Sequence, residues 1–271
     1  MPDHAREGDR VMPFDFDRYR ASRRSASVGA VLVYRDQITS TMDEARTGAA
    51  AGQPAGTAYV AGEQTAGRGR EHRTWISAAD VGLYVTYHLI PKVAANAPLL
   101  SIAGALAVSD ALRATCGLEV DLKWPNDLLH EGRKLCGVLA EARHNATRTD
   151  VFLGIGVNLA TSTDLPPEVA AIATSVAESG VEPPSREVLL GMLAGAIERR
   201  AMQAEVDPAG LIADWRARLV TLGRRVRLHT PGGDVEGDAV DVSPSGELVL
   251  LLDDGERRAF AAGDAITTRD A

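Results

Sequence analysis

The chain has 271 residues, 29 of them basic and 37 acidic, which gives a formal net charge of −8 at pH 7. This charge argues against general nucleic-acid binding, because that affinity comes largely from neutralised phosphates. Hydrophobic residues make up 45% of the chain, which supports a full core and excludes intrinsic disorder. Only two cysteines are present, Cys116 and Cys136, and we expect buried thiols in a reducing cytoplasm. No apolar run reaches the ~18 residues of a membrane span, and the N-terminus lacks the core of a signal peptide.

The start of the chain predicts a leader, a strand and a capped helix. Residues 1–25 are polar and charged, so we expect a flexible leader there, either mobile or loosely docked. The apolar residues 31–34 predict a first strand. Ser40 or Thr41 is a good N-cap for a helix that runs to about residue 51, where a Gly-Gln-Pro sequence ends it.

The middle of the chain alternates between strands and helices. Strands are predicted wherever apolar residues alternate or form short runs, at 57–61, 81–89, 119–123, 135–142 and 151–158. The last two strands are joined by a short polar connection, which predicts an antiparallel hairpin. Apolar residues at helical spacing predict helices at 98–115, about 167–178, 186–204 and 208–220. This pattern predicts an α+β fold with a mixed, largely antiparallel sheet and packed helices.

The composition of the chain changes at Gly223. Four short apolar stretches separated by Gly-rich turns follow, and this arrangement is typical of a small β-barrel. We therefore predict a main domain at 26–222 and a C-terminal domain at 223–271.

The Gly-Arg-Gly-Arg sequence at 67–70 predicts a flexible cationic loop. Its glycines allow backbone N–H groups to approach a ligand, because glycine tolerates positive φ. Arg68, Arg70 and Arg73 carry planar guanidinium groups that suit carboxylate or phosphate. An ordinary solvated basic loop would have the same composition, so this loop does not identify a site by itself.

The Lys-Trp-Pro-Asn-Asp sequence at 123–127 predicts a fixed turn at the end of a strand, since Pro125 keeps the preceding residue out of a helix. A strand-ending turn with a buried tryptophan would explain part of it. However, Lys123 and Asp127 flank the turn, Lys134 lies on the next strand, and a buried lysine is costly unless it meets an anion. Together with the cationic loop, these residues predict a site that holds a carboxylate against a nucleotide phosphate.

Two glycines at 154 and 156 precede Asn158 in another strand. Glycines in a strand often mark close approach by a ligand, although a bulge and a turn asparagine are an alternative. The amide of Asn158 could bond a purine edge. The hydroxyls of Ser40 and Thr41 could bind a polar ring, although helix capping also explains them.

In this order, the motifs resemble those of biotin protein ligases, also called biotin–[acetyl-CoA-carboxylase] ligases. The resemblance covers about residues 36–262 and includes Lys-Leu-Cys-Gly-Val-Leu at 134–139. It implies a biotin ligase catalytic fold, similar to class II aminoacyl-tRNA synthetases, at 26–222 and an SH3-like barrel at 223–271. Only about 35 residues precede the motifs, so we expect the catalytic-only form without the N-terminal DNA-binding domain.

The resemblance implies a two-step reaction with ATP and biotin as substrates and Mg²⁺ as cofactor. Biotin and ATP form biotinyl-5′-AMP, and a lysine of a biotin carboxyl carrier protein or domain of acyl-CoA carboxylases then takes the biotinyl group. This activity is that of a biotin–[biotin carboxyl-carrier protein] ligase. We expect no binding to DNA or membrane, and a monomer or weak homodimer.

The family motifs assign roles to matching residues of this chain. The resemblance implies biotin contacts from Ser40, Thr41, Met42, Gln64, Arg68, Gly69, Arg70 and Lys134. It implies ATP or adenylate contacts from Arg70, Arg73, Trp75, Lys123, Asn126, Lys134 and Asn158. Catalytic roles fall to Lys134, Arg70 and Asp127, of which Asp127 would orient the carrier lysine or hold Mg²⁺.

The chain departs from the family at His72, where a loop glycine is common, and this change should restrict the loop. Two other functions are compatible with parts of the sequence. A lipoate or octanoate ligase or transferase shares the general fold, and a nucleic-acid-binding regulatory module could use the cationic loop and the small barrel. The net charge and the absence of an aromatic platform argue against the second.

Overall fold

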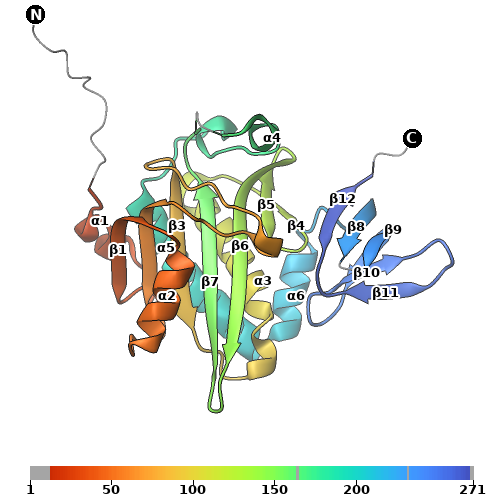
Figure 1. Cartoon of the computed structure of the whole chain (residues 1–271), viewed down its shortest axis with the longest axis horizontal. Helices are drawn as coiled ribbons and strands as arrows, with labels where there is room; N and C mark the ends of the chain where they lie inside the picture. The colour runs from red at the N-terminus through yellow and green to blue at the C-terminus, as the bar shows by residue number, and fades with distance from the viewer. Residues whose placement is uncertain (1–12, 163–164, 231, 269–271) are drawn as a thin grey trace, which may run out of the picture.

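The computed structural model describes residues 13–162, 165–230 and 232–268, and within them the chain forms two β-sheets. Figure 1 shows the larger sheet with helices on both faces and the smaller sheet beside it. The larger sheet has seven strands in the order β1-β2-β3-β7-β6-β5-β4. β1 and β2 are parallel, whereas every other neighbouring pair is antiparallel. The predicted mixed, largely antiparallel sheet is therefore confirmed.

The strands of this sheet lie close to the predicted positions. They are β1 (Leu32–Ile38), β2 (Ala58–Gln64), β3 (Gly82–Leu89), β4 (Asp121–Lys123), β5 (Asp127–His130), β6 (Arg133–His144) and β7 (Thr149–Asn158). β1 is longer than predicted, because the exposed polar residues 35–37 continue an edge strand in which solvent covers one side. β5 was not predicted, since its four residues come directly after the turn and show little alternation.

The described residues contain six α-helices and three short 3₁₀ turns. They are α1 (Phe16–Ser22), α2 (Thr41–Ala50), α3 (Leu99–Cys116), α4 (Pro167–Ala170), α5 (Arg186–Val206) and α6 (Pro208–Arg216), with short 3₁₀ turns η1 (Arg70–His72), η2 (Ala94–Asn96) and η3 (Ala177–Ser179). α2 begins as predicted, because the hydroxyl of Ser40 accepts a hydrogen bond from the backbone N–H of Met42. The helix predicted at 167–178 is wrong in length, since α4 ends at Ala170 and η3 begins only at Ala177.

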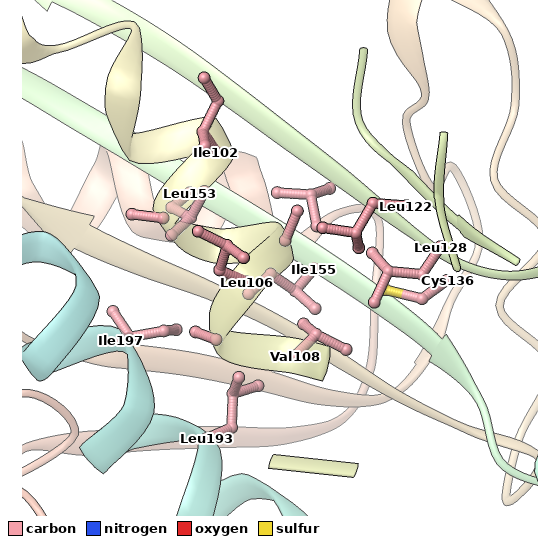
Figure 2. Packing of buried hydrophobic residues seen from close by; sticks show 14 of the residues in the cluster. Ile102, Leu106, Val108, Leu122, Leu128, Cys136, Leu153, Ile155, Leu193 and Ile197 are labelled. Carbon is pink, nitrogen blue, oxygen red and sulfur yellow. The ribbon is translucent and has the colours of Figure 1, made fainter. Parts of the chain in front are cut away.

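α3 forms the centre of the main core. In Figure 2, Ile102, Leu106 and Val108 of this helix lie between Leu153 and Ile155 of the sheet on one side and two residues of α5, Leu193 and Ile197, on the other. By length and composition α3 could cross a membrane, and 67% of it is buried inside the fold. The expectation that no apolar segment reaches the length of a membrane span is therefore wrong for α3. Its apolar residues are explained by packing between the sheet and α5.

Residues 13–25 of the predicted leader dock onto the fold. Phe14 and Tyr19 are buried, and the hydroxyl of Tyr19 donates a hydrogen bond to the carbonyl of Gly29 at 2.7 Å. The ring of Phe14 stacks on Tyr34 of β1 with centroids 4.8 Å apart. Aromatic residues scattered among charged ones thus fasten this segment to the fold. Residues 1–12 of the predicted leader lie outside the described residues.

Glu198 of α5 holds the backbone that leads into the sheet. Its carboxylate accepts hydrogen bonds from the backbone N–H groups of Ala26 and Ser27, both at 2.7 Å, and from that of Val28 at 3.1 Å. Desolvation would raise the pKa of Glu198, but these hydrogen bonds outweigh it and lower the pKa to about 2. The folded state therefore favours the ionised carboxylate.

Glu198→Gln is expected to lower the free energy of unfolding by about 1–2 kcal/mol near pH 7, because charge-assisted hydrogen bonds are replaced by weaker ones. Since the folded pKa is depressed, wild type holds this stability above pH 4.5 and loses it as the pH falls towards 2. Urea titrations at several pH values test this, with exposed Glu182→Gln as the control. A difference between Glu198→Gln and wild type that does not shrink in acid would contradict the assignment.

The smaller sheet follows α6 and packs against the 123–127 turn. Its antiparallel strands are β8 (Arg225–Thr230), β9 (Gly233–Val242), β10 (Leu248–Leu251), β11 (Arg257–Phe260) and β12 (Asp264–Thr267), in the order β11-β10-β9-β8-β12. The described residues thus contain one strand more than the four predicted. Trp124 is buried, as expected for a strand-ending turn, and its indole Nε1 donates to the carbonyl of Gly246 at 3.0 Å. This bond ties the turn to the smaller sheet.

Candidate functional site

A cavity of about 270 Å³ lies over β6 and β7, where almost all of the predicted site residues meet. Among the described residues, its lining includes every predicted site residue except Lys123: Ser40, Thr41, Met42, Gln64, Arg68, Gly69, Arg70, Arg73, Trp75, Asn126, Asp127, Lys134 and Asn158. These residues come from α2, β2, the cationic loop, the 123–127 turn, β6 and β7. The fold thus brings together residues from six segments of the chain.

Glycines form the floor of the cavity. Gly137 of β6 lies directly opposite Gly156 of β7, and Trp75 packs over both. A Cβ atom at Gly156 would lie 2.5 Å from the Trp75 indole, so no larger residue fits without displacing it. Similarly, a Cβ at Gly154 would lie 3.0 Å from the end of Met42. The close approach predicted from these glycines is therefore made by the chain's own side chains.

One end of the cavity is lined by a hydrogen-bonded polar cluster. The Oε1 atom of Gln64 accepts from the backbone N–H of Thr41 at 2.8 Å and from its hydroxyl at 3.0 Å. The Nε2 atom of Gln64 donates to the hydroxyl of Ser77 at 2.8 Å, while the Thr41 hydroxyl also meets that of Thr86 at 2.9 Å. Since these partners fix the orientation of each group, this end of the cavity is preorganised for a small polar ring.

Lys134 and Asp127 form the charged centre of the site. The Nζ atom of Lys134 lies 2.7 Å from Oδ1 of Asp127, and their side chains are 33% and 19% exposed. The same ammonium lies 5.5 Å from the centre of the Trp75 ring, within reach of a cation–π contact. The backbone N–H of Lys134 donates to the carbonyl of Ile172 at 2.7 Å. These contacts hold an ammonium group at the cavity wall.

The predicted cationic loop is a short hairpin. The backbone N–H of Trp75 donates to the carbonyl of Gly67 at 2.9 Å, and that of Gly69 donates to the carbonyl of Arg73 at 2.7 Å. The turn η1 forms its tip, with Glu71 at a φ of 53°, a region that non-glycine residues seldom adopt. We call residues 67–75 the cationic hairpin.

The arginines of the cationic hairpin have different partners. Arg68 pairs with Asp43 of α2 at 2.7 Å. Arg73 pairs with Asp264 at 3.0 Å and with Glu71 at 3.3 Å. Burial lowers the pKa of the Arg70 guanidinium, while the carboxylates of Glu71 and Asp127 oppose that change. Arg70 is thus a partly desolvated cation beside the cavity, where it would interact strongly with an anion.

The two asparagines are partly committed to the fold. The side-chain amide of Asn126 donates to the carbonyl of Val138, which fastens the turn to β6. The amide of Asn158 donates to the carbonyl of Thr174 at 2.9 Å. This bond uses one of the two N–H donors of the Asn158 amide, so its second N–H and its oxygen can meet a ligand.

The placement of Lys123 in the site is not supported, because it does not line the cavity in the part of the chain that is described. It is half-buried on the edge strand β4, opposite Asp127. The argument that a lysine on a strand needs an anion concerns Lys134, which does line the cavity beside Asp127.

The sequence did not predict two parts of the cavity wall. One is an apolar wall from the segment after β7, formed by Leu165, Val169, Ile172 and Ala173. Ile172 is 62% exposed, which is unusual for isoleucine and could have been noticed only with the cavity in view. The other is Asp264, which comes from β12 of the smaller sheet.

The carboxylates of the cavity indicate how the expected Mg²⁺ could be held. Asp127 is paired with Lys134 and Asp264 with Arg73, and the described residues contain no group of three or more potential metal ligands. Mg²⁺ commonly uses one or two carboxylates together with substrate phosphates. The residues present therefore fit an ion carried on the phosphates of ATP, with Asp127 as a candidate ligand, and the described residues do not fit an all-protein metal cage.

Comparison with known proteins identifies the family of this chain. Residues 32–158 match the biotin/lipoate A/B protein ligase family, and residues 221–266 match the biotin protein ligase C-terminal domain. The chain is 39% identical to the biotin–[acetyl-CoA-carboxylase] ligase of Mycobacterium tuberculosis over 79% of its length and 80% of that relative. The chain belongs to the biotin protein ligase family. Another member, the bifunctional ligase/repressor BirA of Bacillus spizizenii, is 32% identical over 90% of this chain and 76% of its own.

Solved biotin protein ligases share the architecture. The enzyme from Aquifex aeolicus in complex with biotin and ATP superposes with a TM-score of 0.77 at 28% identity, over 89% of this chain and all of that one. The family's two matching regions correspond to the two sheets, since residues 32–158 span β1 to β7 and residues 221–266 contain β8 to β11 and most of β12. The cavity of this biotin protein ligase draws residues from both regions, because Asp264 lines it together with β6 and β7.

Proposed function

We propose that this chain uses ATP to join biotin to a lysine of a biotin carboxyl carrier protein or domain, through biotinyl-5′-AMP. The observation that carries this proposal is the Lys134–Asp127 pair, which lies in one cavity with the cationic hairpin and the polar cluster around Gln64. An anhydride between a carboxylate and a phosphate needs cations at the point of bond formation and an anchor for the remainder of the acid. The cavity offers both.

In the first step, an oxygen of the biotin carboxylate attacks the α-phosphorus of ATP, and the bond to the departing pyrophosphate breaks. Negative charge grows on the α-phosphate oxygens, where the Lys134 ammonium would stabilise it, while the Arg70 guanidinium would mainly hold the adenylate once it has formed. Thr41 and Gln64 would hold the polar ring of biotin, and the Trp75 indole and Asn158 would contact the nucleotide. Magnesium would enter with the ATP phosphates and offset their charge.

In the second step, the lysine amine of the carrier attacks the carbonyl carbon of the adenylate, the bond to AMP breaks, and the amine loses a proton. Asp127 would orient the approaching amine, since its carboxylate already holds one ammonium group at 2.7 Å. The cationic hairpin would cover the anhydride between the two steps and limit its hydrolysis. We also propose that the five-stranded sheet is the SH3-like barrel of the family and that the enzyme works in the cytoplasm.

The test is incubation of the protein with ATP, Mg²⁺, biotin and a carrier domain, followed by intact mass measurement. We expect the carrier to gain the mass of one biotinyl group only when ATP is present. Parallel reactions with lipoate test the related ligase branch. A carrier that gains a lipoyl group instead, or a protein that forms no acyl-adenylate at all, would overturn the proposal.

A further inference from the structure

The tip of the cationic hairpin touches the start of β12, which belongs to the smaller sheet. Nη1 of Arg73 lies 3.0 Å from Oδ2 of Asp264, and Nη1 of Arg70 donates to the carbonyl of Gly263 at 3.3 Å. Two arginines of the hairpin thus contact two adjacent residues at the start of β12. Asp264 also lines the cavity, so these contacts lie at its rim.

The strand end that receives the arginines is rigidly placed. Asp264 is paired in register with His229 of β8. Gly263 has a φ of 144°, and a Cβ atom there would lie 2.7 Å from the carbonyl oxygen of His229. Only glycine fits this close approach without displacement, so the position of its carbonyl is set by the sheet itself. By contrast, the hairpin tip is a three-residue 3₁₀ turn that contains a residue at positive φ.

We propose that Gly263 and Asp264 form a latch that holds the cationic hairpin over the cavity, with Asp264 as a positioning residue that acts through Arg73. This inference rests on the proposed function, because the species retained under the hairpin would be the acyl-adenylate. The smaller sheet thereby controls how long the intermediate stays bound, although it supplies no group to the chemistry. Glu71 competes for Arg73 from within the hairpin, at 3.3 Å.

The latch and a direct electrostatic role of Asp264 predict opposite effects of Asp264→Asn on the rate of adenylate release. If Asp264 acted on the ligand, its negative charge would repel the phosphate, and Asp264→Asn would slow adenylate release. If Asp264 acts through Arg73, the same change frees the hairpin and speeds release. The pair is partly exposed, with side chains 56% and 29% accessible, so we expect release to be about three to five times faster.

The experiment measures release of radiolabelled biotinyl-AMP from the full chain after its formation from biotin and ATP. The variants are Asp264→Asn, Arg73→Gln and the double change. Because Asp264 acts through Arg73, the double variant should release no faster than Arg73→Gln alone. Asp253→Asn, which breaks the Arg225–Asp253 pair elsewhere in the smaller sheet, is the matched control and should leave release unchanged.

Thermal melting of each variant separates loss of the latch from loss of the fold. Unchanged or slower release in a folded Asp264→Asn protein, or additive effects in the double variant, would overturn the latch alone. Failure of the wild type to form any biotinyl-AMP would overturn the proposed function and this inference with it.

Discussion

Lys134→Ala is expected to reduce biotinyl-AMP formation by about 10²–10³-fold, the typical loss when one preorganised charge-stabilising group is removed from a reaction centre. The Lys134 ammonium is held by Asp127 at 2.7 Å and lies in the same cavity as Arg70. Removing it takes away a cation that would stabilise the α-phosphate. It also leaves the Asp127 carboxylate unpaired in a half-buried site, where it would repel an anionic ligand.

Pyrophosphate release in a single turnover measures this loss. Two further variants separate its causes. Lys134→Ala combined with Asp127→Asn removes the repulsion by Asp127 but does not restore the cation. We therefore expect only a partial recovery of biotinyl-AMP formation. Lys134→Arg keeps the charge with a different shape and should retain more activity than Lys134→Ala. A Lys134→Ala enzyme that forms adenylate at the wild-type rate would refute the role assigned to this lysine.

Arg70→Ala is expected to leave adenylate synthesis within a few fold of wild type but to release the intermediate about 10–100 times faster. A hydrogen bond to a charged group contributes about 1.5–3 kcal/mol, and Arg70 is a partly desolvated cation in the hairpin that would cover the adenylate. The same change also removes the bond to Gly263, which weakens the latch. Arg70→Ala should therefore speed release of the adenylate more than Asp264→Asn does.

Release of labelled biotinyl-AMP, followed by filtration, compares Arg70→Ala with wild type. Arg148→Ala, which removes an arginine paired with Asp150 on the β6–β7 hairpin and away from the cavity lining, serves as the control for loss of positive charge. Retention of the adenylate by Arg70→Ala as long as by wild type would contradict the covering role of the hairpin. A parallel loss of synthesis would instead indicate that Arg70 acts mainly in the first step.

Local sequence patterns predicted most of the main sheet. The polar connection after β6 predicted the β6–β7 hairpin, and the Ser40 N-cap predicted the start of α2. Both signals lie within a few residues of the structure that they determine. β5 was not predicted, and α4 was predicted too long. Apolar residues in short segments do not distinguish strand, helix and loop.

In the site, too, some features follow from local sequence and others depend on tertiary packing. The residue types of the cationic hairpin, the 123–127 turn and Lys134 point to carboxylate and phosphate chemistry, because their charges and geometry are properties of the residues themselves. In contrast, whether Gly156 faces a ligand or the chain's own Trp75 depends on which segment packs over it.

The sequence by itself determined the reactive groups of this protein, the positions of most main strands along the chain and two features of the ligand site, a set of polar residues and a cationic centre. Tertiary structure alone decided that Lys123 stays outside the cavity and that Asp264, from a strand at the far end of the chain, stands at its rim. The physical reason is that local pattern reports on neighbours along the chain. A pocket, by contrast, is made by side chains whose separation in sequence carries no information about their separation in space.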